Sequence, residues 1–154
     1  MSNRIYSVIE NKKRELDSRI FFALLMNEKG FTVGFGKKQN LYQYSKYLSN
    51  GLFMLKSLGE RNLQTIINLK KNGHLVSSWD EEGFVTFDEK FTKLRNNVNC
   101  LKEIEYLYAW GSKQKKVLKN FLPEFKEKIV SSGHPRFDIL KKNTGLSLNM
   151  KKIK

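Results

Sequence analysis

The chain alternates between helix-type and strand-type patterns, and two of the changes follow the same sequence. Lys29-Gly30-Phe31-Thr32-Val33 and Asn72-Gly73-His74-Leu75-Val76 each lead from a helical pattern through a glycine into an apolar segment. A glycine placed there ends a helix, because it adopts the left-handed conformation without strain. Strands that alternate with helices form parallel sheets with helices on both faces. The sequence therefore predicts an α/β domain with a mostly parallel, Rossmann-like sheet.

Hydrophobic periodicity places the individual elements. Strand-type runs occupy residues 4–10, 31–35, 51–55, 74–79, 106–110 and 129–131. Helical patterns occupy residues 13–29, 60–72, 88–96 and 113–120, with a weaker one at 41–48 and another beginning at 136. On the first helix, an inward stripe at i, i+4, i+7 and i+8 consists of Leu16, Ile20, Ala23 and Leu24, and Phe22 and Met26 widen it. Ser112 is predicted to be the N-cap of the helix at 113–120.

A chain of 154 residues fits one domain of ordinary size. We expect residues 1–142 to form it, and the polar, cationic residues 143–154 to be a frayed tail or the start of a second domain. The longest apolar run, residues 20–26, is too short to cross a bilayer, and no apolar leader precedes the first strand. These features predict a cytoplasmic protein. The lone Cys100 permits no intrachain disulfide, and no Cys/His spacing suggests a metal site.

The net charge of +14 suggests an anionic partner. Only six of the 29 basic residues are arginines, the side chain best suited to bidentate contacts with phosphates and bases. The lysines are also spread along the whole chain. Specific nucleic-acid binding is therefore disfavoured, whereas peripheral contact with an anionic membrane, such as the inner face of the cell membrane, agrees with the charge.

Charged residues follow several of the predicted strands. In a parallel sheet, the segments after the strands gather at one edge, where such folds bind ligands. The segments that we expect there are Glu10 to Arg19, Asp80-Glu81-Glu82-Gly83, Trp110-Gly111-Ser112 and His134-Pro135-Arg136.

Each of these segments has a plainer interpretation. Glu15 and Arg19 have the i, i+4 spacing of a surface ion pair, which we prefer for Arg19. Lys13 and Arg14 oppose the helix dipole, so they either contact an anionic ligand or are solvated charges. Among Asp80, Glu81 and Glu82, one acid with a raised pKa would suit a general base, and a solvated turn is an equally good interpretation.

Two further motifs also allow two interpretations. Gly111-Ser112 at a helix start could bind a phosphate, although a simple N-cap is favoured. His134 suits acid–base or ligand-binding chemistry, and as the residue before Pro135 it also suits a role that only fixes the backbone, which we prefer. Arg136 is the stronger candidate for contact with a ligand.

Four segments together resemble bacterial surface carbohydrate biosynthesis proteins. They are Ile9 to Arg19, Asp80-Glu81-Glu82-Gly83, Tyr108-Ala109-Trp110-Gly111 and Gly133-His134-Pro135-Arg136-Phe137-Asp138. The last is also similar to the Gly-x-Pro-Arg-x-Asp segment of CDP-glycerol glycerophosphotransferases, with His134 at a position where Asn or Tyr is expected. Both groups resemble GT-B transferases, in which two Rossmann-like domains face each other across a cleft.

The resemblance implies the N-terminal, acceptor-side domain of a transferase of cell-surface polysaccharides. A glycosyl or glycerophosphoryl group would pass from a nucleotide-activated donor to a glycan or lipid-linked acceptor, without a metal or other cofactor. A donor-binding domain, in the same chain or in a second one, would complete the cleft, so the chain alone is expected to be inactive. The expected site residues are Asp80, Glu81, Glu82 and His134 for catalysis, and Glu10, Lys13, Arg14, Gly111, Ser112 and Arg136 for ligand binding.

The sequence also fits other functions. The chain could be one subunit of a split two-chain glycosyltransferase. It could also be a basic module that binds a membrane surface or nucleic acid. A nucleotide-sugar epimerase would share the same two-domain plan.

Overall fold

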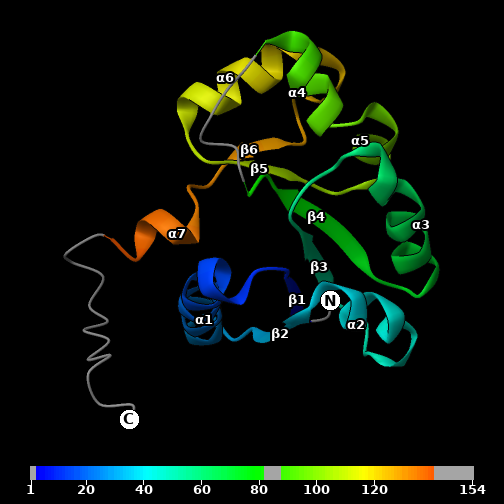
Figure 1. Cartoon of the computed structure of the whole chain (residues 1–154), viewed down its shortest axis with the longest axis vertical. Coiled ribbons are helices and arrows are strands. Elements are labelled where there is room, and N and C mark those ends of the chain that lie inside the picture. Colours follow the sequence, from blue (N-terminus) through cyan, green and yellow to red (C-terminus); the bar gives the residue numbers. More distant parts are fainter. Residues whose placement is uncertain (1–2, 82–87, 141–154) are drawn as a thin grey trace.

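The computed structural model describes residues 3–81 and 88–140, which form one α/β domain (Figure 1). All its strands are parallel and belong to one six-stranded sheet in the order β2-β1-β3-β4-β5-β6. The strands are β1 (Arg4–Ile9), β2 (Thr32–Lys37), β3 (Leu52–Leu55), β4 (Leu75–Trp79), β5 (Leu107–Ala109) and β6 (Ile129–Ser131). The Rossmann-like fold predicted from the alternating pattern is confirmed.

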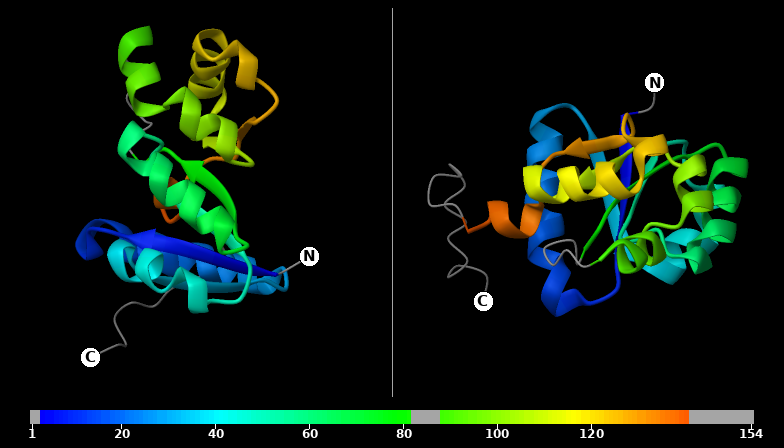
Figure 2. Two further views of the ribbon diagram at one scale, coloured as in Figure 1. Left: turned by 90° about the vertical axis from the view of Figure 1, so that its right-hand side faces the viewer. Right: turned by 90° about the horizontal axis from the view of Figure 1, so that it is seen from above.

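Helices follow the strands and lie on both faces of the sheet (Figures 1 and 2). They are α1 (Lys12–Glu28), α2 (Lys38–Gln43), α3 (Leu63–Lys71), α4 (Glu89–Arg95), α5 (Val98–Glu103), α6 (Ser112–Phe121) and α7 (Pro135–Asp138). Single 3-10 turns occur at Ser45–Tyr47, Glu60–Asn62 and Pro123–Phe125. Because β3 pairs on the side of β1 opposite to β2, the strand order reverses at β1. The carboxyl ends of β1 and β3 therefore border the switch point of the sheet, the usual place for ligands in such folds.

The larger hydrophobic core lies on the face covered by α2, α3, α5 and α6. From β3, Phe53 and Leu55 enter it, and both are almost fully buried. The helices contribute Ile66, Leu69 and Leu118, and Cys100 lies among them as a small buried residue. Burial raises the pKa of the Cys100 thiol to about 11, which keeps it protonated and unreactive at neutral pH.

A smaller core lies on the face covered by α1 and α7. Met54 and Trp79 form it with Ile5, and Phe22 and Met26 of α1 pack against them. A cavity of about 700 Å³ remains beside them, between α1, the sheet and α7. One long helix and one short one therefore cover this face incompletely.

The inward stripe predicted for the first helix is wrong for Ile20 and Leu24, whereas Phe22 and Met26, predicted to widen it, do pack inward. Ile20 and Leu24 are each 37% exposed, whereas the buried residues of α1 are Glu15, Ser18, Arg19 and Phe21. The amino-terminal half of α1 lies over the polar carboxyl ends of the strands and buries charged side chains there. Only its second half packs on the apolar face, through Phe22 and Met26.

The two glycines predicted to end helices do so. Gly30 and Gly73 have φ values of 82° and 84°, in the left-handed region that other residues rarely adopt. His74, which follows Gly73, is buried, and its Nε2 lies 2.9 Å from the Ser45 carbonyl oxygen. This contact is at the amino end of the sheet, so His74 has the structural role expected of it.

Residues 143–154, predicted to be a tail, lie outside the described part of the chain, as does Glu82. Within residues 3–81 and 88–140, no helix combines the length and the hydropathy needed to cross a membrane.

Gly51 allows a close approach between β1 and the start of β3. A Cβ atom at this position would lie 2.7 Å from the Arg4 carbonyl oxygen and 2.9 Å from the Tyr6 ring. We predict that Gly51→Ala lowers the free energy of unfolding by about 2 kcal/mol, because the sheet backbone must move to relieve the clash. Urea denaturation followed by circular dichroism measures the change.

Gly59→Ala is the matched control. A Cβ atom at Gly59 has nothing within 4 Å, and the backbone angles there, φ −60° and ψ 153°, suit alanine. We expect its free energy of unfolding to stay within about 1 kcal/mol of the wild type. Equal losses in the two variants would contradict the steric explanation.

Candidate functional site

Two acidic and two basic side chains meet at the switch point, and we call them the switch-point cluster: Glu10, Glu15, Lys38 and Lys56. Lys56, directly after β3, places its Nζ 2.7 Å from both Glu10 Oε2 and Glu15 Oε1. Lys38 Nζ lies 2.8 Å from Glu10 Oε1. Glu15 and Lys56 are buried, but the Glu10 side chain is 44% exposed. Glu10 is thus the member of the cluster most open to a ligand.

Backbone hydrogen bonds fix the turn between β1 and α1 beside this cluster. Glu15 accepts hydrogen bonds from the backbone N–H groups of Glu10 and Asn11, at 2.9 and 3.3 Å. Asn11 caps α1 by accepting a bond from the Arg14 backbone N–H. Lys13 and Arg14 are exposed in the first turn, with Arg14 Nη2 3.4 Å from Glu15 Oε1. The expected ligand-binding residues Glu10, Lys13 and Arg14 therefore belong to one turn.

The lysines keep the carboxyl groups of the switch-point cluster ionised. Hydrogen bonds from Lys38 and Lys56 lower the pKa of Glu10 to about 2. Burial raises the pKa of Glu15, but Lys56 and the backbone N–H groups outweigh this effect and the pKa falls below its usual value. Both side chains are therefore hydrogen-bond acceptors, and weak bases, at neutral pH.

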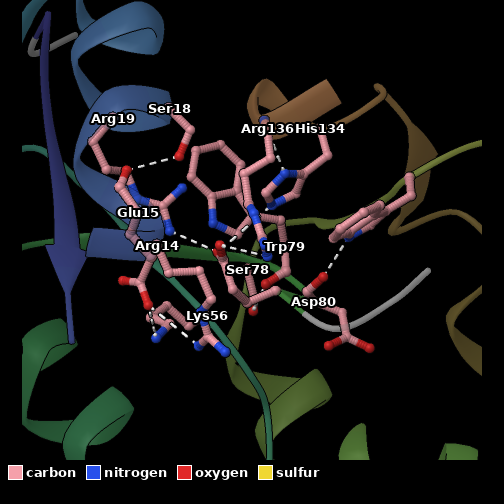
Figure 3. A network of polar contacts seen from close by, with 12 residues as sticks. Arg14, Glu15, Ser18, Arg19, Lys56, Ser78, Trp79, Asp80, His134 and Arg136 are labelled. Atoms are coloured by element: carbon pink, nitrogen blue, oxygen red, sulfur yellow. Dashed lines mark hydrogen bonds and ion pairs between the residues drawn. The ribbon is translucent and has the colours of Figure 1, made fainter. Parts of the chain in front are cut away.

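A second group of ionisable residues lies further along the same edge, and we call it the Glu81 cluster: Arg19, Glu81, His134 and Arg136. Figure 3 labels three of them, Arg19, His134 and Arg136. Arg19 Nη2 donates a hydrogen bond to Glu81 Oε2 at 2.7 Å, and both side chains are buried. His134 Nε2 lies 3.5 Å from the same oxygen, and Arg136 Nη1 lies 3.7 Å from Oε1. One carboxylate thus connects α1, the segment after β4 and α7.

Aromatic rings enclose the Glu81 cluster. The Arg19 guanidinium lies 4.6 Å from the centroid of the Trp79 ring, and the His134 ring is stacked on Trp110 with centroids 4.2 Å apart. The Trp110 indole N–H donates to the Asp80 carbonyl oxygen, and the Asp80 carboxylate pairs with Arg95. The described residues of all four segments therefore meet where the carboxyl ends of the strands lie, and we call this end of the sheet the carboxyl edge.

The surface pair predicted between Glu15 and Arg19 is wrong. Both side chains have 0% exposure, Glu15 binds Lys56, and Arg19 binds Glu81. The two side chains share a helix face, but each has a closer partner of opposite charge that folding brings from the sheet.

A raised pKa is also wrong for Glu81. Burial raises its pKa, but His134 and Arg19 stabilise the carboxylate more strongly and bring the pKa down to about 2. Asp80 is buried and paired with Arg95. The solvated turn is therefore wrong for these two acids, which are buried within the fold, whereas Glu82 falls outside the described residues.

The structure also corrects one predicted cap and clarifies the two roles of His134. Gly111 is the N-cap of α6, and Ser112, predicted to be the cap, is its first residue and is exposed. His134 Nδ1 accepts a hydrogen bond from the Arg136 backbone N–H at 3.3 Å and so caps α7. Buried at 1% exposure, His134 has the backbone-fixing role preferred from the sequence. Arg136 keeps 33% of its side chain exposed.

Sequence reasoning missed the two lysines of the switch-point cluster. Lys38 and Lys56 each follow a strand, β2 and β3, by one residue, and this position is the signal that could have found them. Trp79, the last residue of β4, and Arg95 were likewise not recognised.

Within the described residues, no three His, Cys, Asp or Glu side chains gather into a set that could hold a metal ion. The arrangement instead offers a half-exposed carboxylate with adjacent cations, a set suited to hydroxyl and phosphate groups. Comparisons of the chain with known protein families, curated proteins and solved structures give no match. The fold and the geometry of the carboxyl edge therefore carry the functional argument.

The Arg19–Glu81 pair predicts how stability depends on pH. We expect Glu81→Gln to lower the free energy of unfolding at pH 7 by about 3 kcal/mol, because it leaves the buried Arg19 without its counter-charge. Since folding depresses the pKa of Glu81 from 4.5 to about 2, its contribution is present above pH 4.5 and is lost as the pH falls towards 2. Urea denaturation at pH 7, 5 and 3 should show the difference from wild type shrinking at the lowest pH.

Two further variants test the cause of that loss. Glu103→Gln removes an exposed pair with Lys70 and should leave the unfolding midpoint close to the wild type. Arg19→Met combined with Glu81→Gln should be less destabilised than the sum of the single variants, because neither charge then remains alone. Additive losses would show that the two residues do not depend on each other.

Proposed function

We propose that this domain is the acceptor side of a transferase in cell-surface polysaccharide biosynthesis. In that role a glycosyl or glycerophosphoryl group passes from a nucleotide-activated donor to a hydroxyl group of a glycan or lipid-linked acceptor. The observation that carries the proposal is the meeting, at the carboxyl edge, of the four segments that resemble surface carbohydrate biosynthesis proteins. Arg19, Glu81 and His134 of the Glu81 cluster come from three of those segments, and Trp110, which is stacked on His134, comes from the fourth.

The switch-point cluster supports an acceptor that carries both a hydroxyl and a phosphate. Lys38, which is 32% exposed, and the first turn of α1 provide cations for phosphate oxygens. The Glu10 carboxylate beside them accepts a hydrogen bond from the hydroxyl. With a pKa of about 2, Glu10 orients that hydroxyl rather than removing its proton completely.

The Glu81 cluster has a different role in this proposal. Glu81 remains ionised and buried, so it holds α1 and α7 in place beside the acceptor. Arg136, with a third of its side chain exposed, is the member of this cluster available to a phosphate group.

Binding of small probes tests the proposal. Farnesyl phosphate and glycerol 3-phosphate represent the acceptor, and UDP-glucose and CDP-glycerol represent the donor. We expect the two acceptor probes, farnesyl phosphate and glycerol 3-phosphate, to bind. Lys38→Gln should weaken farnesyl phosphate binding about tenfold through loss of one charge-assisted hydrogen bond. Glu10→Gln should strengthen it, because the variant removes the carboxylate that competes for Lys38. Isothermal titration calorimetry measures both changes.

Lys29→Gln is the matched control for this experiment. Lys29 is an exposed lysine at the opposite end of α1, so its loss should leave the affinity unchanged. Binding of the donor probes, with no binding of the acceptor probes, would assign the domain to the donor side. Absence of all binding, or equal losses in Lys29→Gln and Lys38→Gln, would contradict the proposal.

A further inference from the structure

A basic surface without acidic partners lies at the β6 end of the molecule, where α4 packs against α6 (Figure 1). The helix α6 carries four lysines and no acidic residue. We call this region the α4/α6 surface, and it consists of Lys90, Leu94, Lys113, Lys115, Lys116 and Lys119. Within residues 3–81 and 88–140, none of its five lysines forms an ion pair. The charge is therefore available to a partner.

The sequence of α6 places these cations on the side away from the core. Gln114 and Leu118 are buried, whereas Lys113 and Lys116 are exposed. Lys115 and Lys119 are half-buried, so their aliphatic stems cover apolar surface while the ammonium groups reach water. The helix thus has one apolar and one cationic side.

The position of Lys113 adds a second reason to expect an anionic partner. It lies in the first turn of α6, which contains no acidic residue. A cation there opposes the helix dipole, and a negatively charged surface near the turn offsets that cost. The described acids of this region have other roles or places: Asp88 caps α4, Glu89 pairs with Lys93, and Glu124 and Glu127 follow the other end of α6.

Leu94 on α4 determines which kind of anionic partner fits. Its side chain is 71% exposed and lies on the helix between Lys93 and the Arg95 that pairs with Asp80. An exposed leucine among lysines can enter the headgroup region of a bilayer, where burial of apolar area adds to the attraction of anionic lipids. It contributes nothing to contact with a sugar–phosphate backbone.

The cations of this surface also differ from those of nucleic-acid readers. All five free cations are lysines, and Arg95, the arginine of α4, is already bound to Asp80. Lysine binds phosphate as a point charge, whereas base recognition relies on the planar fork of arginine. The described part of α4 and α6 offers no strongly exposed aromatic ring on which a base could stack.

We propose that the α4/α6 surface docks the domain onto an anionic lipid bilayer. Five lysines contribute by charge and Leu94 by insertion between the headgroups. The carboxyl edge, from which α6 begins, is then held close to the membrane. This inference does not depend on the transferase proposal, because it rests on charge and exposure alone.

Sedimentation with lipid vesicles tests it. In 0.1 M salt the protein should bind vesicles of phosphatidylcholine with 30% phosphatidylglycerol, but not vesicles of phosphatidylcholine alone. The triple variant K113Q/K116Q/K119Q should lower the partition coefficient about 100-fold, since each lysine close to the surface contributes roughly fivefold. Adding Leu94→Asn to the triple variant should lower the partition coefficient further, without changing its dependence on salt concentration.

A control triple variant separates this surface from the overall charge. K29Q/K46Q/K71Q removes the same charge from exposed lysines elsewhere, and it should change the partition coefficient less than about fivefold. Equal losses in the two triple variants, or no binding to the anionic vesicles, would overturn the proposal. Binding of duplex DNA or RNA at the same salt concentration, dependent on the α6 lysines and stronger than vesicle binding, would assign the surface to nucleic acid instead. Circular dichroism checks that each variant is folded.

Discussion

The buried ion pair between Arg19 and Glu81 is the interaction on which the carboxyl edge depends. It joins the second turn of α1 to the residue that lies two positions after β4, and the same carboxylate faces His134 and Arg136 at α7. Two charges removed from water are stable only when each has its partner, so none of the three segments can move alone. The pair therefore couples the positions of α1, β4 and α7.

This coupling explains why the two faces of the sheet are built differently. On the larger face, Phe53, Ile66 and Leu69 pack as an ordinary apolar core. On the other face, the first half of α1 buries Glu15 and Arg19 against charges at the strand ends, and only the second half packs through apolar side chains. Ion pairs thus hold the first half of α1 against the sheet, as hydrophobic packing holds the other helices. Because α1 turns its charged side chains toward the strand ends, Ile20 and Leu24 remain exposed.

The fold could be predicted from the sequence, because short apolar runs bounded by glycines and helical patterns recur along the chain. The meeting of the Glu10, Asp80 and His134 segments could also be predicted, because parallel strands place their carboxyl ends together. The pairings within the site did not. Arg19 and Glu81 are 62 residues apart, and nothing local encodes their contact, whereas the i, i+4 spacing of Glu15 and Arg19 suggested a pair that folding does not form.

Exposure divides the charged residues of the carboxyl edge into two groups with different roles. Glu15, Arg19, Lys56 and Glu81 are buried, and moving any of them away from its partner leaves a charge alone inside the protein. Glu10, Lys38 and Arg136 keep about a third or more of their side chains in water, so they can exchange a partner for a ligand at small cost. Because Lys38 already binds Glu10, an incoming phosphate gains only the difference between the two contacts. Recognition at this edge therefore favours ligands that offer Glu10 a new partner, such as a hydroxyl group, while they take its lysine.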